Sequence, residues 1–252
     1  MKNRLEYKYL VPLHCIDELR KDLLTYLNYD EYASLRPNHE YTVHSIYLDS
    51  YDYKCYYEKL DGIHTRKKFR IRGYNKPEDA SKVFLEIKRK YDNFISKDRA
   101  GATFEEILQA LTHSHSESYF NIEQQSDYRN FYYYYHLRRL EPKVLIVYER
   151  EPFECKFGSQ LRITFDKNLR SRIVSDYHEL FNEEGLVERF KKEFIFEIKF
   201  YQVLPQWINR VLTKFDLTRT AVSKYTSSID THNSTAVSIN KFTRTDFSNR
   251  ME

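Results

Sequence analysis

The feature that most constrains the fold is a period-two alternation of apolar and ionic residues, which recurs in at least six segments of the sequence. Successive side chains of a strand point to opposite faces. In residues 66–74, Lys68, Arg70 and Arg72 therefore share one face, while Phe69 and Ile71 share the other. The other ionic faces consist of Glu6 and Lys8; Glu86, Lys88 and Lys90; Tyr148 and Arg150; Arg162; and Glu197 and Lys199.

For one such strand, the simplest interpretation is an ordinary antiparallel sheet with one face in water. The six strands together favour a different arrangement, because faces made mainly of Arg, Lys and Glu bring many cations within repulsive range of one another. Such a surface requires a polyanion, or an anion bridged by a cation. If the sheet closes with these faces inward, about eight strands leave room for one slender ligand such as a phosphate chain.

The same patterns predict the order of the elements. We expect strands at residues 4–10, 42–48, 66–74, 83–90, 143–153, 160–166 and 193–201, and helices at residues 13–27, within 103–140 and from Pro205 onward. The helices are amphipathic and would cover the apolar outer faces of the sheet. We expect a single domain over residues 1–230, and a polar tail over residues 231–252 that is poorly ordered or forms a weak final strand.

Composition narrows the class of protein. The net charge of +4 does not by itself indicate a nucleic-acid partner, and none is expected. Cys15, Cys55 and Cys155 are few and widely spaced, which favours free thiols in a reducing compartment. The sequence has neither a signal peptide nor a membrane span, so we expect a cytoplasmic protein.

Several motifs resemble one known family when they are taken in order. They are Glu6-Tyr-Lys8-Tyr, Ser45-Ile-Tyr-Leu-Asp49, Lys67-Lys-Phe-Arg70-Ile-Arg72, Phe84-Leu-Glu86-Ile-Lys88, Tyr148-Glu-Arg150, Leu161-Arg162-Ile-Thr, Phe196-Glu197-Ile-Lys199-Phe, Pro205-x-Trp207-Ile208 and Ser223-Lys224-Tyr225. Together they resemble the polyphosphate polymerase domain of the vacuolar transporter chaperone (VTC) family, within the triphosphate tunnel metalloenzyme superfamily. The resemblance covers residues 4 to about 230.

The resemblance implies an α+β fold, mainly antiparallel β, with a closed eight-stranded tunnel barrel whose ionic interior is flanked by amphipathic helices. It implies transfer of the γ-phosphate of ATP to inorganic polyphosphate or pyrophosphate, with release of ADP and with Mn²⁺ or Mg²⁺ as cofactor. The residues that it implies as catalytic are Lys8, Arg70, Arg72, Lys88, Arg150, Arg162 and Lys199. Those that it implies as phosphate- or nucleotide-binding are Glu6, Tyr148, Ser223, Lys224, Lys97 and Arg99, and those that it implies as metal ligands are Glu197 and Glu86.

Some alternatives stay open at this point. Lys97 and Arg99 could instead be a solvated pair in a loop. Arg4 occupies a position where the superfamily's first-strand signature has Glu, which resembles the polymerase branch more than the triphosphatase branch. An inorganic triphosphatase or polyphosphatase on the same tunnel is the first alternative function, and a non-catalytic polyphosphate-binding module is the second.

Overall fold

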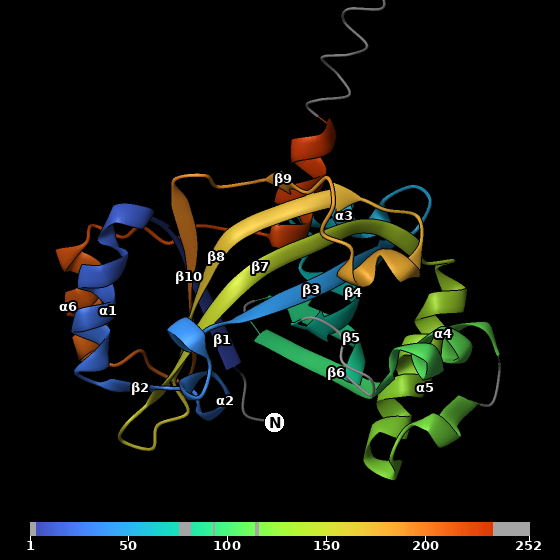
Figure 1. Cartoon of the computed structure of the whole chain (residues 1–252), viewed down its shortest axis with the longest axis horizontal. Coiled ribbons are helices and arrows are strands. Elements are labelled where there is room, and N and C mark those ends of the chain that lie inside the picture. The colour runs from blue at the N-terminus through green and yellow to red at the C-terminus, as the bar shows by residue number, and fades with distance from the viewer. Residues whose placement is uncertain (1–3, 76–81, 93, 114–115, 234–252) are drawn as a thin grey trace, which may run out of the picture.

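The computed structural model describes residues 4–75, 82–92, 94–113 and 116–233. Within them, one antiparallel sheet closes on itself through eight strands in the order β7-β3-β4-β5-β6-β1-β10-β8, with β8 returning to β7 (Figure 1). These strands are β1 (Arg4–Pro12), β3 (Tyr41–Asp49), β4 (Thr65–Tyr74), β5 (Lys82–Tyr91), β6 (Phe94–Thr103), β7 (Glu141–Cys155), β8 (Arg162–Ile173) and β10 (Glu193–Tyr201). The predicted mainly antiparallel fold with an eight-stranded tunnel is confirmed.

Two short strands extend the ring at its edges. β2 (Leu27–Tyr29) pairs with the end of β7, and β9 (Val187–Glu188) pairs with β8. The ring is most weakly joined between β1 and β6, where Arg4 and Ile95 form the one paired position among the described residues. Elsewhere the ladders are long, and β5 pairs with β6 over the whole of both strands.

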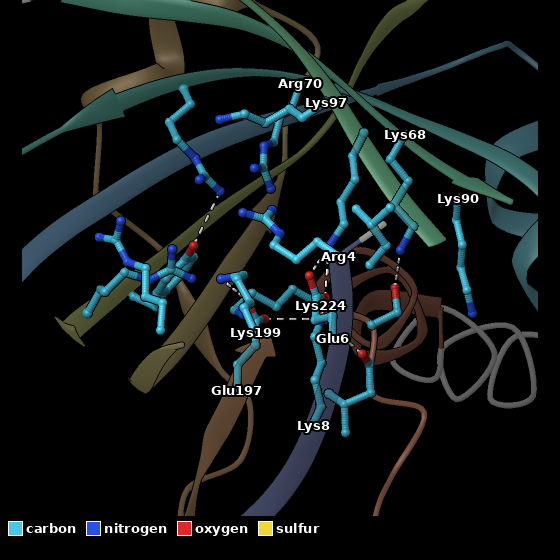
Figure 2. Close-up of a pocket in the computed structure, with 18 of the residues that line it drawn as sticks. Arg4, Glu6, Lys8, Lys68, Arg70, Lys90, Lys97, Glu197, Lys199 and Lys224 are labelled. Carbon is cyan, nitrogen blue, oxygen red and sulfur yellow. Dashed lines mark hydrogen bonds and ion pairs between the residues drawn. The ribbon is translucent and has the colours of Figure 1, made fainter. Parts of the chain in front are cut away.

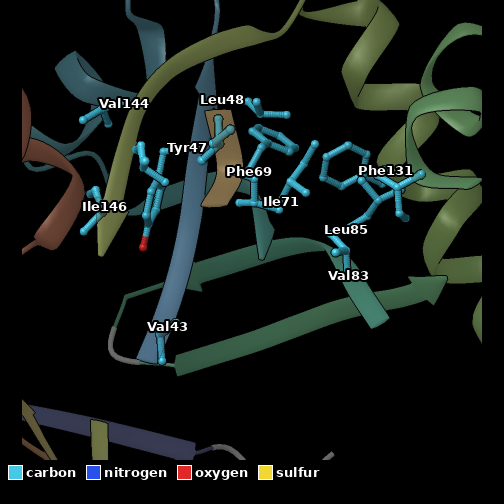
Figure 3. Packing of buried hydrophobic residues seen from close by; sticks show 14 of the residues in the cluster. Val43, Tyr47, Leu48, Phe69, Ile71, Val83, Leu85, Phe131, Val144 and Ile146 are labelled. Atoms are coloured by element: carbon cyan, nitrogen blue, oxygen red, sulfur yellow. The ribbon is translucent and has the colours of Figure 1, made fainter. Parts of the chain in front are cut away.

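The alternation of side chains divides the ring into an ionic interior and an apolar exterior. Phe69, Ile71 and Leu85 point outward and are almost completely buried (Figure 3). They belong to a core that also receives Phe131 from the helical layer. A second core lies across the barrel, beneath Phe165 and its neighbours. The apolar outward positions of these strands are therefore covered, and the charges of the same strands lie on the inward faces.

Helices on two sides of the ring supply this cover (Figure 1). On one side lie α1 (Ile16–Leu24) and α6 (Gln206–Lys214), and on the other lie α4 (Phe104–Thr112) and α5 (Ile122–Leu137). Shorter turns are α2 (Glu31–Ser34), α3 (Lys54–Leu60), η1 (Leu13–Cys15), η2 (Pro37–His39), η3 (Ser116–Tyr119) and η4 (Tyr177–Phe181). Among the helices of the described ranges, none is both long and apolar enough to cross a membrane.

The structure differs from the sequence-based expectation in three places. Residues 94–103 form strand β6, which was not predicted because these residues lack the apolar alternation; its buried outward positions include the small residues Ala100 and Ala102. The helix predicted at residues 13–27 ends at Leu24, since Leu27–Tyr29 pairs with β7. Residues 224–233 are helical, so the predicted tail begins within a helix; its remainder, residues 234–252, lies outside the described residues.

Candidate active site

The interior of the ring is a cavity of about 910 Å³. Among the described residues that line it, seventeen are Lys or Arg and three are Asp or Glu. The ionic faces of β1, β4, β5, β7, β8 and β10 all contribute, and the segment before the C-terminal helix, residues 219–224, completes the wall. The predicted excess of positive charge is therefore enclosed within the fold and is not spread over an outer surface.

Two carboxylates and three lysines that line the cavity bind one another, and Figure 2 labels Glu6, Lys8, Glu197 and Lys199 among them. Lys8 Nζ lies 3.1 Å from Glu6 Oε1 and 3.4 Å from Glu197 Oε2. Lys88 Nζ donates to both oxygens of Glu6 at 2.8 and 2.7 Å, and Lys199 pairs with Glu197. The register between β1 and β10 produces this arrangement, because it places Glu6 opposite Lys199 and Lys8 opposite Glu197.

Both of these carboxyl groups are ionised despite their burial. Burial and the charge of Glu197 act to raise the pKa of Glu6, but Lys88 and Lys8 outweigh them and lower it far below its usual range. Burial also opposes ionisation of Glu197, and the charges of Lys199 and Lys8 again hold the pKa well below its ordinary value. Lys199 is buried as well, and its burial lowers its pKa to about 8, although the charge of Glu197 acts to raise it.

Glu86 lies behind the cavity wall and holds four cations. Its side chain is 1% exposed, and Arg70 donates to Oε2 through Nε at 2.7 Å. Arg72 lies 3.8 Å from the same oxygen, while Lys97 and Arg99 lie 3.2 and 3.3 Å from Oε1. The pKa of Glu86 lies well below its usual range, because these charges outweigh the effect of burial. Glu86 thus orients the guanidinium groups that reach the cavity.

Asp166 has the same role on the opposite wall, and the sequence analysis missed it. Arg150 donates to both carboxylate oxygens at 2.7 and 2.8 Å, and Lys224 Nζ lies 2.5 Å from Oδ2. Burial raises the pKa of Asp166, but Arg150 and Lys224 dominate and the pKa is about 2. Its position four residues after Arg162, on the same strand face, is the signal that could have identified it.

Tyrosine and serine hydroxyl groups also bind Arg70 and Arg72. Arg70 Nη1 donates to the Tyr47 hydroxyl at 2.9 Å. Arg72 donates to Ser45 Oγ at 3.1 Å and to the Tyr148 hydroxyl at 3.2 Å. Burial alone would raise the pKa of Tyr47, but the charges of Arg70 and Arg72 lower it to about 8.

The segment before the C-terminal helix brings two further groups into the cavity. The Thr220 amide donates to the Lys8 carbonyl at 2.8 Å, which attaches this segment to β1. Lys68 Nζ donates to Ser223 Oγ at 2.6 Å. Burial, reinforced by the charges of Lys8 and Lys88, holds the pKa of Lys68 well below its usual range. Lys68 was recognised on its strand face but was not predicted to belong to the site.

Of the residues predicted for the site, all but Glu86 line the cavity. They are Glu6, Lys8, Arg70, Arg72, Lys88, Lys97, Arg99, Tyr148, Arg150, Arg162, Glu197, Lys199, Ser223 and Lys224. Arg162 lies near an opening, with its side chain 43% exposed and bound to Asp30 at 2.8 Å. Lys97 and Arg99 lie on β6 and not in a loop. The individual roles of these residues stay predictions.

The family was identified by comparison with known proteins. The model of the VTC domain matches residues 3–249, which is nearly the whole chain. This chain belongs to the VTC domain family. The resemblance stated from the motifs is thereby confirmed, and VTC domain proteins are a phosphate-handling family of tunnel enzymes. A search of curated proteins found no match.

Solved structures with a similar chain path were also found. A candidate adenylate cyclase from Bacillus halodurans has 13% identity and a TM-score of 0.48, covering 88% of this chain and 94% of that chain. The PH1819 protein from Pyrococcus horikoshii OT3 has 13% identity and a TM-score of 0.47, covering 90% and 99%. An adenylyl cyclase-like protein from Hippeastrum, described as having a dominant triphosphatase activity, has 13% identity and a TM-score of 0.46, covering 90% and 95%. Scores this low say nothing about the activity of this chain.

VTC domain membership implies use of a divalent metal in general, and such an ion requires side chains that can serve as its ligands. Among the described residues, no group of three or more His, Cys, Asp or Glu side chains could hold an ion alone. Glu6 and Glu197 flank Lys8 in the cavity and supply carboxylate oxygens, the donor type that Mg²⁺ and Mn²⁺ prefer. Glu6 and Glu197 are therefore the residues of the cavity that would hold a hard cation.

Proposed function

We propose that this VTC domain protein is a polyphosphate polymerase that transfers the γ-phosphate of ATP to a growing inorganic polyphosphate chain and releases ADP. The observation that supports it is the cavity of about 910 Å³ inside the ring, which seventeen Lys and Arg side chains of the described residues line. Phosphoryl transfer depends mainly on positioning and on neutralising charge, and this cavity supplies both. A phosphate chain is slender and carries charge along its whole length, so it matches such a space.

In the proposed mechanism, paired arginines hold the triphosphate. Arg70 and Arg72 are fixed by Glu86, and Arg150 is fixed by Asp166, so their geometry exists before the substrate binds. Guanidinium groups bind phosphate oxygens through two donors, which orients the phosphate as well as attracting it. Lys8, Lys88 and Lys199 add point charges in the cavity, where the transferred group would lie.

The transfer itself requires no general base. An anionic terminal oxygen of the acceptor chain forms a bond to the γ-phosphorus, and the bond from that phosphorus to the bridging oxygen of ADP breaks. No proton has to leave the nucleophile. This agrees with the lining carboxylates, since Glu6, Glu197 and Asp30 are each already paired with Lys or Arg.

Glu197 and Glu6 would hold Mn²⁺ or Mg²⁺ in this proposal. The metal, when bound, would neutralise charge on the phosphate oxygens. The prediction that Glu86 is a second ligand stays untested. Its contacts favour a role in positioning arginines, because Glu86 binds Arg70 and Lys97 but is not among the residues that line the cavity. The substrates would be ATP and inorganic polyphosphate or pyrophosphate. The predicted cytoplasmic location and the absence of a nucleic-acid partner stay predictions.

One observation favours hydrolysis as a second candidate function. Lys68 lines the cavity, where its amine donates to Ser223 Oγ at 2.6 Å, and burial among other cations lowers its pKa, which makes it the candidate base for an attacking water. Water would then replace the chain end as nucleophile, and the protein would be a triphosphatase or polyphosphatase.

The decisive experiment follows ADP, orthophosphate and long-chain polyphosphate together after the purified protein is mixed with ATP and Mn²⁺. Polyphosphate that grows in step with ADP supports the polymerase, and orthophosphate without chain growth identifies the triphosphatase. The Lys199→Ala variant should lose turnover, whereas Lys214→Ala, which removes an exposed lysine of α6, should retain it. If the wild-type protein binds polyphosphate without turnover, both enzyme assignments are contradicted and the non-catalytic polyphosphate-binding module is supported.

A further inference from the structure

The two ends of the cavity differ in chemistry. The side chains of β5 that line the cavity are Phe84, Lys88 and Lys90, and Glu86 lies on the same strand face behind the wall. At about 3.3 Å per residue, Phe84 and Lys90 are separated by about 20 Å along the strand. In the next strand of the ring, Arg72 pairs with Phe84 and Arg66 pairs with Lys90. The aromatic end and the cationic end of the lining therefore lie far apart.

The end near Lys90 is built for anions. It is lined by Lys59, Arg66, Lys90 and Arg219. Burial, reinforced by the charges of the other three residues, lowers the pKa of Lys90. None of these four has a carboxylate partner at ion-pair distance within the described ranges. Figure 2 shows Lys90 and Lys68 on one side of the site, away from Arg70 and Lys97. This end suits a chain of phosphates.

The opposite end carries a row of aromatic rings. Tyr32, Tyr41, Tyr74 and Phe84 line the cavity there. Neighbouring ring centroids lie 5.3 Å apart for Tyr32 and Tyr41, 5.7 Å for Tyr41 and Tyr74, and 6.0 Å for Tyr74 and Phe84. A phosphate chain has no planar group and gains little from these rings.

Neighbouring rings of this row meet edge to face, and Arg99 adds a planar cation that lies over one of them. Its guanidinium carbon lies 3.6 Å from the centroid of the Phe84 ring, and Nη2 donates to the Tyr74 hydroxyl at 3.1 Å. Phe84 lies directly over Gly101, where an added Cβ would be 2.5 Å from the ring, so only glycine lets the ring lie this close to the strand. Glu86 holds Arg99 from behind at 3.3 Å, yet 34% of the Arg99 side chain is exposed.

We propose that Arg99, Phe84, Tyr74 and Tyr32 form a nucleobase-binding site at this end of the tunnel. The base stacks on the Arg99 guanidinium plane and contacts the neighbouring rings, and the triphosphate extends inward to Arg70, Arg72 and Arg150. Nucleobases stack on aromatic rings and on Arg guanidinium planes, and the contact is tolerant of base identity. The site deepens the proposed function, on which it rests, by making a nucleoside triphosphate the donor and by setting its direction in the tunnel.

The test compares two ligands that share a triphosphate. Binding of inorganic tripolyphosphate and of an ATP analogue with a non-hydrolysable β–γ linkage is measured by calorimetry, at one salt concentration and with Mg²⁺ present. The Arg99→Lys variant keeps the positive charge and loses the plane. We expect about tenfold weaker binding of the ATP analogue, within the range for one lost base stack, and tripolyphosphate affinity within about twofold of wild type.

Other variants complete the pattern. Tyr32→Ala, at a half-exposed ring, should also weaken only the ATP analogue, and tripolyphosphate binding shows that the variant is folded. Lys90→Ala, at the cationic end, should change the affinities for the ATP analogue and for tripolyphosphate by the same factor. Equal losses for both ligands in Arg99→Lys would make Arg99 a phosphate contact and overturn the proposal, and so would unchanged affinity for both.

The outcome is separable from that of the proposed function. Selective loss of ATP-analogue binding in a protein that only hydrolyses ATP would sustain the nucleobase site and refute the polymerase. If the wild-type protein synthesises polyphosphate and the Arg99→Lys variant binds both ligands normally, the polymerase is supported and the nucleobase site is refuted.

Discussion

The Tyr225 hydroxyl donates a hydrogen bond of 2.7 Å to Asp49 Oδ2, in the buried space where β3 ends. Asp49 also accepts from the backbone amides of Ser50, Cys55 and Tyr56, so this carboxylate binds the start of α3 as well. Tyr225 follows Ser223 and Lys224, whose side chains enter the cavity. The contact therefore ties the position of two candidate phosphate-binding residues to the end of a core strand.

Removing this hydroxyl should affect both stability and binding. Tyr225→Phe leaves a buried carboxylate oxygen without one of its donors, and we expect a loss of about 1–3 kcal/mol in the free energy of unfolding. The Michaelis constant for ATP should rise several-fold, because Lys224 is less well placed. Tyr56→Phe is the matched control, since its hydroxyl bonds Asp230 at an exposed position. A Tyr225→Phe protein with lower stability and normal kinetics would limit the contact to a structural role.

Glu86 should contribute strongly to stability as well as to the site. Glu86→Gln removes the only negative charge among the described residues that faces Arg70, Arg72, Lys97 and Arg99 together. Removing one partner from a buried set of ion pairs lowers the free energy of unfolding by about 3–5 kcal/mol, because the remaining charges stay buried without compensation. Urea unfolding followed by the fluorescence of Trp207, the single tryptophan, measures the loss. Added tripolyphosphate should restore part of the stability by supplying the missing charge, and a variant as stable as wild type would refute this interpretation.

The affinity of the site for triphosphate should fall as the pH rises through about 8. The pKa of Tyr47 is lowered to about 8, because Arg70 and Arg72 outweigh its burial. Above this pH, the free protein carries a tyrosinate that repels phosphate and competes for Arg70. Bound phosphate should in turn raise the pKa of Tyr47. Ultraviolet titration with and without tripolyphosphate measures both effects, and the tyrosinate signal near pH 8 should be missing from Tyr47→Phe.

The second core provides a test of the fold that is independent of the site. Phe165 is fully buried and packs against Phe153, Phe194 and Phe196. Phe165→Ala should cost about 3–5 kcal/mol of unfolding free energy. Phe157→Ala is the same substitution at a ring that is 73% exposed, and it should change stability by less than about 0.5 kcal/mol. Equal effects of the two variants would contradict the assignment of Phe165 to the core.

Much of the architecture could be predicted from local patterns. Glu193–Tyr201 was predicted with its bounds as the structure has them, because Phe196, Ile198 and Phe200 alternate cleanly with Glu197 and Lys199. β6 was missed because its outward positions are small: Ala100 and Ala102 lie against α4 and α5, and such residues give no apolar period. The C-terminal helix was missed because Ser, Thr and Asp dominate residues 226–231, although Tyr225 and Ile229 bury it.

The sequence by itself determined which side chains share a strand face, because the two-residue period of a strand is a local property of the backbone. This period was enough to predict an ionic interior made of Lys8, Arg70, Lys88, Arg150 and Lys199. Only the tertiary structure decided which charges of different segments meet. Asp166 pairs with Lys224, and Glu86 with Arg99, through strand register and ring closure, which depend on contacts between residues far apart in the chain. The same closure separates an aromatic end from a cationic end, a difference that no single strand shows.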